Sequence, residues 1–252
     1  MSPAAATRRV VRAVVAGPGA RRALCDGFDG EVELAFGPGG YVRCGDRWLL
    51  LAPARSPVGP LSVLVAGLSR GDLVPGDAAV VTDGALVVGA LQITLAGARE
   101  VPPLRSGPPM PGWRQALDCA LAVVPPAPCA LAPGIAALAA GDLEAAPARL
   151  AGRGEGLTPA GDDVLAGFAG WRWAAGAPVT LPAGRCAPLG RDYLRCAERG
   201  ELPEPAAAVL SAIRGGDAAA AARRAGGLAR WGASSGAALL WGMAAAAAET
   251  PT

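Results

Sequence analysis

Apolar and polar residues alternate in short runs over the first hundred residues of the chain. In residues 31–36, Val32, Leu34 and Phe36 share one face, which is typical of a half-buried strand. Turns that contain glycine separate these runs, and Asp83-Gly84 is a strong signal for a two-residue hairpin. Closely spaced strands joined by tight turns predict a small antiparallel sheet or barrel. The expected strands cover residues 31–36, 41–52 with a turn at 45–46, 61–65, 78–82 and 86–95.

The pattern changes after a proline-rich stretch that begins at residue 101. Beyond it, apolar residues recur at helical spacing, and alanine, the best helix former, is abundant. We therefore predict an α+β protein with a β-rich domain in residues 1–100, a proline-rich linker in 101–112 and a helical domain in 113–252. No internal repeat is visible. The expected helices cover residues 113–124, 135–140, 143–151, 159–175, 188–199, 205–214, 218–230 and 236–247.

The composition removes several kinds of catalytic site. All 23 basic residues are arginines, and the chain contains no lysine, histidine or asparagine. It therefore has no serine–histidine–aspartate triad, no histidine metal ligand, no Schiff-base lysine and no P-loop lysine. Catalysis in this chain must use carboxylates, arginine, hydroxyls, thiols, backbone amides or a metal bound by oxygen atoms.

Charge and hydropathy limit the partners and the compartment. A net charge of +2 with scattered arginines does not predict a nucleic-acid partner. The segment Met1–Arg22 does not resemble a secretory signal, because Arg12 interrupts its apolar run. The uncharged runs 119–141 and 231–248 are broken by proline or built from weakly apolar residues, so no membrane span is expected. These observations predict a cytoplasmic protein.

The most informative stretch begins with three alternating glycines, Gly152, Gly154 and Gly156. Glycines in this arrangement allow backbone amides to turn toward one point. Thr158 follows at a position suited to cap a helix, and Pro159 suits the first helical position. Because a helix start offers free amides and the positive end of the helix dipole, this loop predicts an anion site. The residues expected to bind the anion are Arg153, Gly154, Gly156, Leu157, Thr158 and Gly161.

Two adjacent acids, Asp162 and Asp163, occupy the first turn of the same helix. Their charges would repel an anion unless Mg²⁺ bridges them or one of them binds an N–H donor of the substrate. Both are therefore candidate catalytic residues and candidate magnesium ligands. Asp163, Gly167 and Gly170 share a helix face with little side-chain bulk, which predicts that another group approaches closely there. The alternative interpretation is an ordinary capped helix after a flexible loop.

The sixteen residues from Gly152 to Gly167 resemble the signature of the AllH-like family, Gly-x-Gly-x-Gly-Leu-Thr-Pro-x-Gly-Asp-Asp-x-Leu-x-Gly. This family was formerly a domain of unknown function and is now named for a subunit of oxamate carbamoyltransferase. A fainter resemblance extends to residues 59–62, to 186–201 and to the late segment 231–237. In the late segment, Ser234, Ser235 and Gly236 precede an apolar helix, as a cap or as a second group of donors to the substrate.

The chain departs from the family pattern at several positions. Cys186 and Ala187 stand where the family tends to have two threonines, and Gly190 stands in place of a serine. In the late segment, Ala233 replaces a histidine, and an acid expected near Ala237 or Ala238 is missing. If these family groups act on the substrate, this protein has a different substrate or a weak activity.

The resemblance implies a subunit of a carbamoyltransferase in allantoin or purine catabolism, which binds carbamoyl phosphate and a small amide or carboxylate such as oxamate. The amides of residues 152–161 would hold the phosphate, Arg153 would neutralise charge, and Asp162 and Asp163 would position a metal or the carbamoyl amide. The family also implies partner subunits. Two alternatives stay open, namely a non-catalytic binding or scaffolding subunit and a magnesium–nucleotide enzyme.

Overall fold

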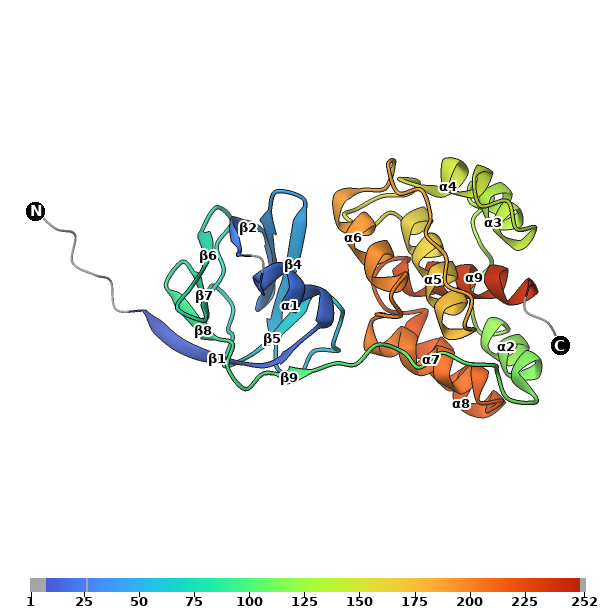
Figure 1. Ribbon diagram of the computed structural model, residues 1–252, viewed down its shortest axis with the longest axis horizontal. Helices are drawn as coiled ribbons and strands as arrows, with labels where there is room; N and C mark the ends of the chain where they lie inside the picture. Colours follow the sequence, from blue (N-terminus) through green and yellow to red (C-terminus); the bar gives the residue numbers. More distant parts are fainter. Residues whose placement is uncertain (1–7, 26, 250–252) are drawn as a thin grey trace, which may run out of the picture. The chain divides into compact units, whose positions relative to one another are not determined.

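The computed structural model describes residues 8–25 and 27–249, and contacts between residues divide the chain into two compact units (Figure 1). The first unit is Met1–Pro102 and the second is Pro103–Thr252. Strands build the first unit and helices build the second, which confirms the predicted α+β class. Residues 1–7, the beginning of the segment compared with secretory signals, lie outside the described residues.

The strands of the first unit form one sheet that closes on itself. Their hydrogen-bonded order is β5-β4-β3-β2-β6-β7-β8-β1-β9, and β1 also pairs with β5, so the sheet forms a barrel with β9 at one edge. The strands are β1 (Arg9–Ala16), β2 (Asp29–Phe36), β3 (Gly39–Cys44), β4 (Arg47–Pro53), β5 (Ser62–Ala66), β6 (Ala78–Thr82), β7 (Ala85–Val88), β8 (Leu91–Thr94) and β9 (Arg99–Glu100).

Most neighbouring strands are antiparallel, as the alternation and the tight turns predict. Three pairs are parallel instead, namely β1–β8, β1–β9 and β4–β5. The sequence did not predict β1, because Arg9 and Arg12 interrupt its apolar pattern. In the structure both arginines are exposed, while Ala13 and Val15 of the same strand are buried. The short helix α1 (Pro18–Cys25), also not predicted, buries Ala20 and Leu24.

Within the described residues, the second unit contains helices at every predicted position. All of their ends agree with the predicted ranges to within three residues. The helix predicted for 159–175 begins at Ala160 with Pro159 as its N-cap and without a side-chain cap, so the predicted cap by Thr158 is wrong. The helices are α2 (Trp113–Leu121), α3 (Ala132–Ala139), α4 (Ala145–Leu150), α5 (Ala160–Ala174), α6 (Pro188–Ala197), α7 (Glu204–Arg214), α8 (Ala218–Leu228) and α9 (Ser235–Ala248).

Helices α5 and α9 form the centre of the helical unit and are buried along most of their length (Figure 1). A Cβ atom added to Gly167 would lie 2.1 Å from the carbonyl oxygen of Leu239. A Cβ atom added to Gly242 would lie 2.0 Å from the carbonyl oxygen of Val164. Only glycine fits at such distances, so the two helices touch backbone to backbone.

The segment predicted as a linker, residues 101–112, contains no helix or strand. From Pro103 onward its contacts assign it to the helical unit. The Leu104 amide donates to the Gly200 carbonyl at 2.9 Å, and the Met110 amide donates to the Arg214 carbonyl at 2.7 Å. Among the described residues, none of the helices is both long and apolar enough to cross a membrane.

The contact between α5 and α9 yields the first prediction. Replacing Gly167 with alanine should lower the free energy of unfolding by about 1–3 kcal/mol, because the new methyl group must push a backbone carbonyl away. Gly227 in α8 is the matched control, since no atom outside its own helix lies within 4 Å of an added Cβ. Its replacement by alanine should leave stability unchanged or raise it by up to about 1 kcal/mol. Urea unfolding followed by circular dichroism measures both, and equal effects would contradict the packing.

Candidate functional site

Asp162 joins the glycine loop to the start of another helix. Its Oδ1 atom accepts a hydrogen bond from the Gly152 amide at 2.7 Å. Its Oδ2 atom accepts one from the Ala187 amide at 2.8 Å. The side chain is buried, with 1% of the residue exposed. The carboxylate therefore ties the first residue of the loop to the segment that leads into α6.

The surroundings of Asp162 explain several residues of the segment 186–191. Burial raises the pKa of Asp162, while the two amides, the Cys186 thiol and the charge of Arg191 act in the opposite direction. Burial and the neighbouring Asp162 raise the pKa of Cys186 to about 12, so this thiol is a poor nucleophile. A Cβ atom at Gly190 would lie 2.3 Å from the Asp162 carboxylate. The glycine at this position therefore leaves room for the acid.

Asp163, the neighbouring acid, has a different environment. Only 6% of the residue is exposed, and its Oδ2 atom has no hydrogen-bond partner among the described residues. Burial raises the pKa of Asp163 to about 7, and the Asp162 charge adds to this increase, whereas a hydrogen bond with Ser235 opposes it. A buried carboxyl group that titrates near neutral pH, with a polar atom left unpaired, is typical of functional sites.

Ser235 brings the two sequence motifs together. It is the first residue of α9, and its hydroxyl contacts both the Asp163 carboxyl and, at 3.3 Å, the Thr158 hydroxyl. Asp163 lies in the first turn of α5, so the starts of α5 and α9 adjoin. Further along, Gly167 faces Leu239, which shows that the two helices run in the same direction. Their positive dipole ends therefore point to one place.

The two helix starts have the same local structure. In the first, the Gly161 amide donates to the Arg153 carbonyl at 2.8 Å, and an added Cβ would lie 1.9 Å from the Leu150 oxygen. In the second, the Gly236 amide donates to the Trp231 carbonyl at 3.1 Å, and an added Cβ would lie 1.7 Å from the oxygen of Leu228. Each glycine thus lets a new helix begin against the last carbonyl of the preceding one.

This arrangement is a structural repeat that the sequence does not reveal. Asp163 lies two residues after Gly161 in α5, and Ala238 lies two residues after Gly236 in α9. The second copy therefore lacks the acid of the first. Ser234 occupies the N-cap position of α9, but its side chain makes no cap hydrogen bond. The described residues thus offer one carboxyl group, that of Asp163, between the two helix starts.

The glycine loop itself is on the surface. Residues 152–157 are exposed, and Thr158 is half-buried. The amides of Gly152, Arg153 and Gly161 already donate within the protein. Among the described residues, the amides of Gly154, Glu155, Gly156, Leu157 and Thr158 have no backbone acceptor. These five amides and the hydroxyl of Thr158 are therefore the donors that the loop can offer to an anion.

The sequence predicts that another group approaches the α5 face formed by Asp163, Gly167 and Gly170. In the structure, this group is another part of the same chain. Leu239 of α9 contacts Gly167, and an added Cβ at Gly170 would lie 2.8 Å from the side chain of Leu202. Asp163, the third member, contacts Ser235. This face of α5 therefore packs against α9 and Leu202.

The two acids differ in what they can offer to the expected magnesium ion. Both oxygens of Asp162 accept amide hydrogens, whereas the Oδ2 atom of Asp163 has no hydrogen-bond partner among the described residues. Mg²⁺ is usually held by one or two carboxylates together with water molecules and substrate phosphates. Among the described residues, no group of three or more metal-binding side chains exists. A magnesium site would therefore depend on Asp163, and it stays a prediction, as does the magnesium–nucleotide enzyme.

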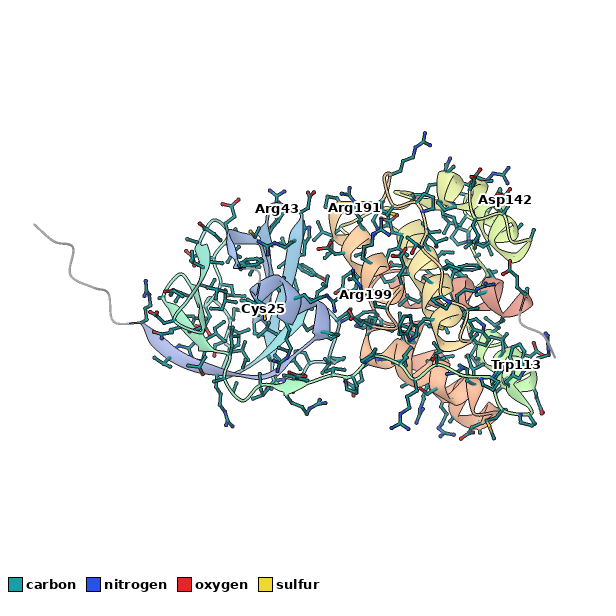
Figure 2. All side chains as sticks on the ribbon, viewed as in Figure 1. Cys25, Arg43, Trp113, Asp142, Arg191 and Arg199 are labelled. Atoms are coloured by element: carbon teal, nitrogen blue, oxygen red, sulfur yellow. The ribbon has the colours of Figure 1, made fainter. Side chains whose placement is uncertain are left out.

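Sequence reasoning missed the role of Arg191, whose charge acts on both Asp162 and Cys186. Arg191 lies on α6 and is labelled in Figure 2. Its amide donates to the Ala187 carbonyl at 2.8 Å, so it lies one helical turn beyond the amide that binds Asp162. The spacing from Ala187 to Arg191 could have suggested a shared helix face, but nothing in the sequence linked that face to Asp162.

The geometry defines a helical unit in which two helix starts and a glycine loop surround a buried, protonatable carboxyl group. Residues 150–247, which contain all of these elements, match the model of the family described as oxamate carbamoyltransferase subunit AllH. This match confirms the resemblance that the motifs indicate. Comparison with curated proteins and with solved structures gave no significant match.

The different environments of the two acids predict opposite effects of one chemical change. Unfolded Asp163 releases its proton near pH 4, whereas folded Asp163 keeps it until about pH 7. The free energy of unfolding therefore decreases as the pH rises from about 4 to about 7 and then levels off. Asp163→Asn removes this loss, so its stability relative to the wild type should increase by up to about 4 kcal/mol between pH 4 and pH 8. Urea unfolding at several pH values measures the difference.

Asp162→Asn is the matched comparison. Its new NH₂ group must face one of the two amide donors, so the variant loses a hydrogen bond and should be less stable by about 1–3 kcal/mol at pH 8. If Asp163→Asn showed no change with pH relative to the wild type, the buried, protonated state of Asp163 would be wrong.

Proposed function

We propose that the protein is a subunit of a carbamoyltransferase-type enzyme and binds carbamoyl phosphate with a small amide or carboxylate such as oxamate. The observation that carries the proposal is the buried carboxyl group of Asp163 between two helix starts, whose Oδ2 atom has no hydrogen-bond partner among the described residues. It lies within the segment that matches the carbamoyltransferase subunit family. A buried polar atom without a partner is expected where a ligand supplies the missing hydrogen bond.

The glycine loop supports the binding of the phosphate group. The free amides of Gly154, Gly156 and Leu157 lie in an exposed loop, and Gly154 and Gly156 adopt positive φ angles of 118° and 88°. Successive amides in such conformations form concave anion sites. Arg153, exposed in the same loop, would add a bidentate contact to a phosphate. The parallel starts of α5 and α9 would add two positive dipole ends.

Asp163 fits the chemistry of carbamoyl transfer. The nitrogen of the acceptor attacks the carbonyl carbon of carbamoyl phosphate, a carbon–nitrogen bond forms, and the carbon–oxygen bond to phosphate breaks. The phosphate leaves with that bonding pair, and the attacking nitrogen loses a proton. A carboxyl group with a pKa of about 7 can donate a hydrogen bond to the carbonyl oxygen or accept this proton at neutral pH. Thr158 and Ser235 would orient it through their hydroxyls.

A second candidate, a non-catalytic subunit, is favoured by the residues that replace polar family positions. Asp162 is contacted by the thiol of Cys186 and the backbone amide of Ala187. At the second helix start, Ala238 stands at the position that corresponds to Asp163, so this helix start has no acid. In both candidates the protein acts with other subunits, as the name of the family suggests. The two candidates differ in whether the chain itself binds the substrate.

Titration calorimetry with fresh carbamoyl phosphate separates these candidates. The catalytic proposal expects binding to the wild type and at least tenfold weaker binding to Asp163→Asn and to Arg153→Gln, since each loses a charged or protonated contact. Arg149→Gln, an exposed residue of α4 outside the loop, is the matched control and should bind like the wild type. Circular dichroism verifies that each variant is folded.

The same titration is repeated with the partner subunits co-purified. Lack of binding by the wild type both alone and in this complex would overturn the catalytic proposal in favour of a scaffolding subunit. Equal binding by Asp163→Asn and the wild type would also contradict it.

A further inference from the structure

A cavity in the sheet unit is built by loops that the strand pairing brings together. β4 and β5 are parallel, with Leu51 opposite Val63, so their carboxyl ends lie at the same edge. The turn before β3 lies at this edge as well, because Gly40 of β3 pairs with Leu51 of β4. The cavity between these loops has a volume of about 500 Å³. Its lining residues are Pro38, Pro53, Ala54, Arg55, Val65, Gly67, Leu68, Ser69 and Arg70.

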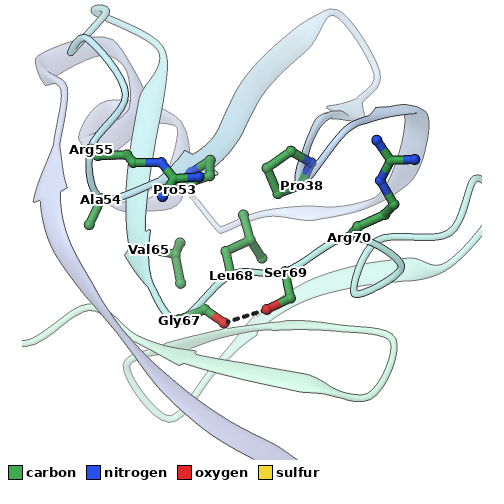
Figure 3. A pocket seen from close by; sticks show the side chains of 9 residues that line it. All are labelled: Pro38, Pro53, Ala54, Arg55, Val65, Gly67, Leu68, Ser69 and Arg70. Carbon is green, nitrogen blue, oxygen red and sulfur yellow. Dashed lines mark hydrogen bonds between the residues drawn. The ribbon is translucent and has the colours of Figure 1, made fainter.

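Two arginine side chains line the cavity, and apolar residues lie between them. Arg55 and Arg70 are both exposed, and neither has an ion-pair partner among the described residues. Figure 3 shows the two arginines on opposite sides of the cavity, with Pro38 and Leu68 between them. None of the nine lining residues is acidic. The cavity therefore presents two separated positive charges across an apolar surface.

The loop that carries Arg70 is held in place by its own hydrogen bonds. The Asp72 carboxylate accepts the Ser69 amide at 2.6 Å and forms an ion pair with Arg9. Arg9 also donates to the Gly67 carbonyl at 3.0 Å, and the Ser69 hydroxyl donates to the same oxygen at 3.4 Å (Figure 3). Arg9 thus satisfies the charge of the neighbouring acid. The charges of Arg55 and Arg70 therefore stay available for a ligand. Because the loop is already held in one conformation, binding to it costs less entropy.

On the other side, the turn after β4 positions Arg55. The Ala54 amide donates to the Val65 carbonyl at 3.0 Å, and the Ser56 amide donates to the Pro53 carbonyl at 2.9 Å. The residue between these two donors is Arg55. Both arginines therefore extend from hydrogen-bonded turns, while Val65 and Leu68 are buried beneath them.

We propose that this cavity is a binding site for a small, elongated dicarboxylate, with one carboxylate at Arg55, the other at Arg70 and the aliphatic middle against Pro38 and Leu68. Arginine binds carboxylates through paired hydrogen bonds, and the two arginines lie on opposite sides of the apolar surface. The cavity volume lies within the usual range for small-molecule sites. This site is independent of the function proposed for the helical unit.

Calorimetry with a series of linear diacids, from succinate to suberate, tests the proposal on the full-length protein. One chain length in the series should bind best, and at least tenfold more tightly than hexanoate, which has the apolar chain but one charge. Arg55→Gln and Arg70→Gln should each weaken binding of this diacid about tenfold or more. The matched control is Arg99→Gln, an exposed arginine of β9 outside the cavity, which should bind like the wild type.

Several results would overturn the proposal. These are equal binding of hexanoate and the best diacid, no detectable binding of any diacid, and equal weakening by Arg99→Gln and the two cavity variants. Tighter binding of hexyl phosphate than of every diacid would also overturn it, because it would indicate one anion-binding position instead of two. Carbamoyl phosphate binding by the same variants should remain unchanged, which separates this site from the one in the helical unit.

Discussion

The buried carboxylate of Asp162 is the interaction on which the candidate site depends. It accepts the amides of Gly152 and Ala187, which belong to segments 35 residues apart, and it has almost no exposed surface. A buried acceptor of this kind is stable only while both donors are in place. Asp162 therefore holds the glycine loop and the start of α6 beside the first turn of α5, which carries Asp163.

Two adjacent acids thus do different work because their partners differ. Two amides satisfy Asp162, whereas Asp163 has one hydroxyl partner and an unpaired oxygen. Burial without compensation raises the pKa of Asp163 to about 7 and destabilises its ionised form. Groups that destabilise a protein are retained mainly where they have a function. Asp163 is therefore the stronger candidate for a catalytic residue, whereas Asp162 has a structural role.

Local pattern predicted much of the fold and part of the site. Alternation and glycine turns located β2 to β6, and alanine-rich periodicity located the helices from α2 to α9. The single strand predicted over 86–95 is wrong, because the structure divides it into the antiparallel strands β7 and β8. The pattern did not predict β1, because its exposed arginines interrupt the run of apolar residues that it buries. It was also wrong about the cap of α5, because the Thr158 hydroxyl contacts Ser235 and does not cap its own helix. Sequence spacing could not reveal that the two helix starts adjoin, because the backbone contact of Gly167 with Leu239 depends on the tertiary packing of α5 against α9.

The protonation of Asp163 in the folded protein is the centre of this account. Nuclear magnetic resonance of protein labelled with ¹³C at aspartate carboxyl carbons can follow Asp163, assigned by its loss in Asp163→Asn, as the pH is varied. The account predicts a midpoint near pH 7, which rises when carbamoyl phosphate brings negative charge beside the carboxyl group. A midpoint near pH 4 that does not respond to carbamoyl phosphate would contradict it.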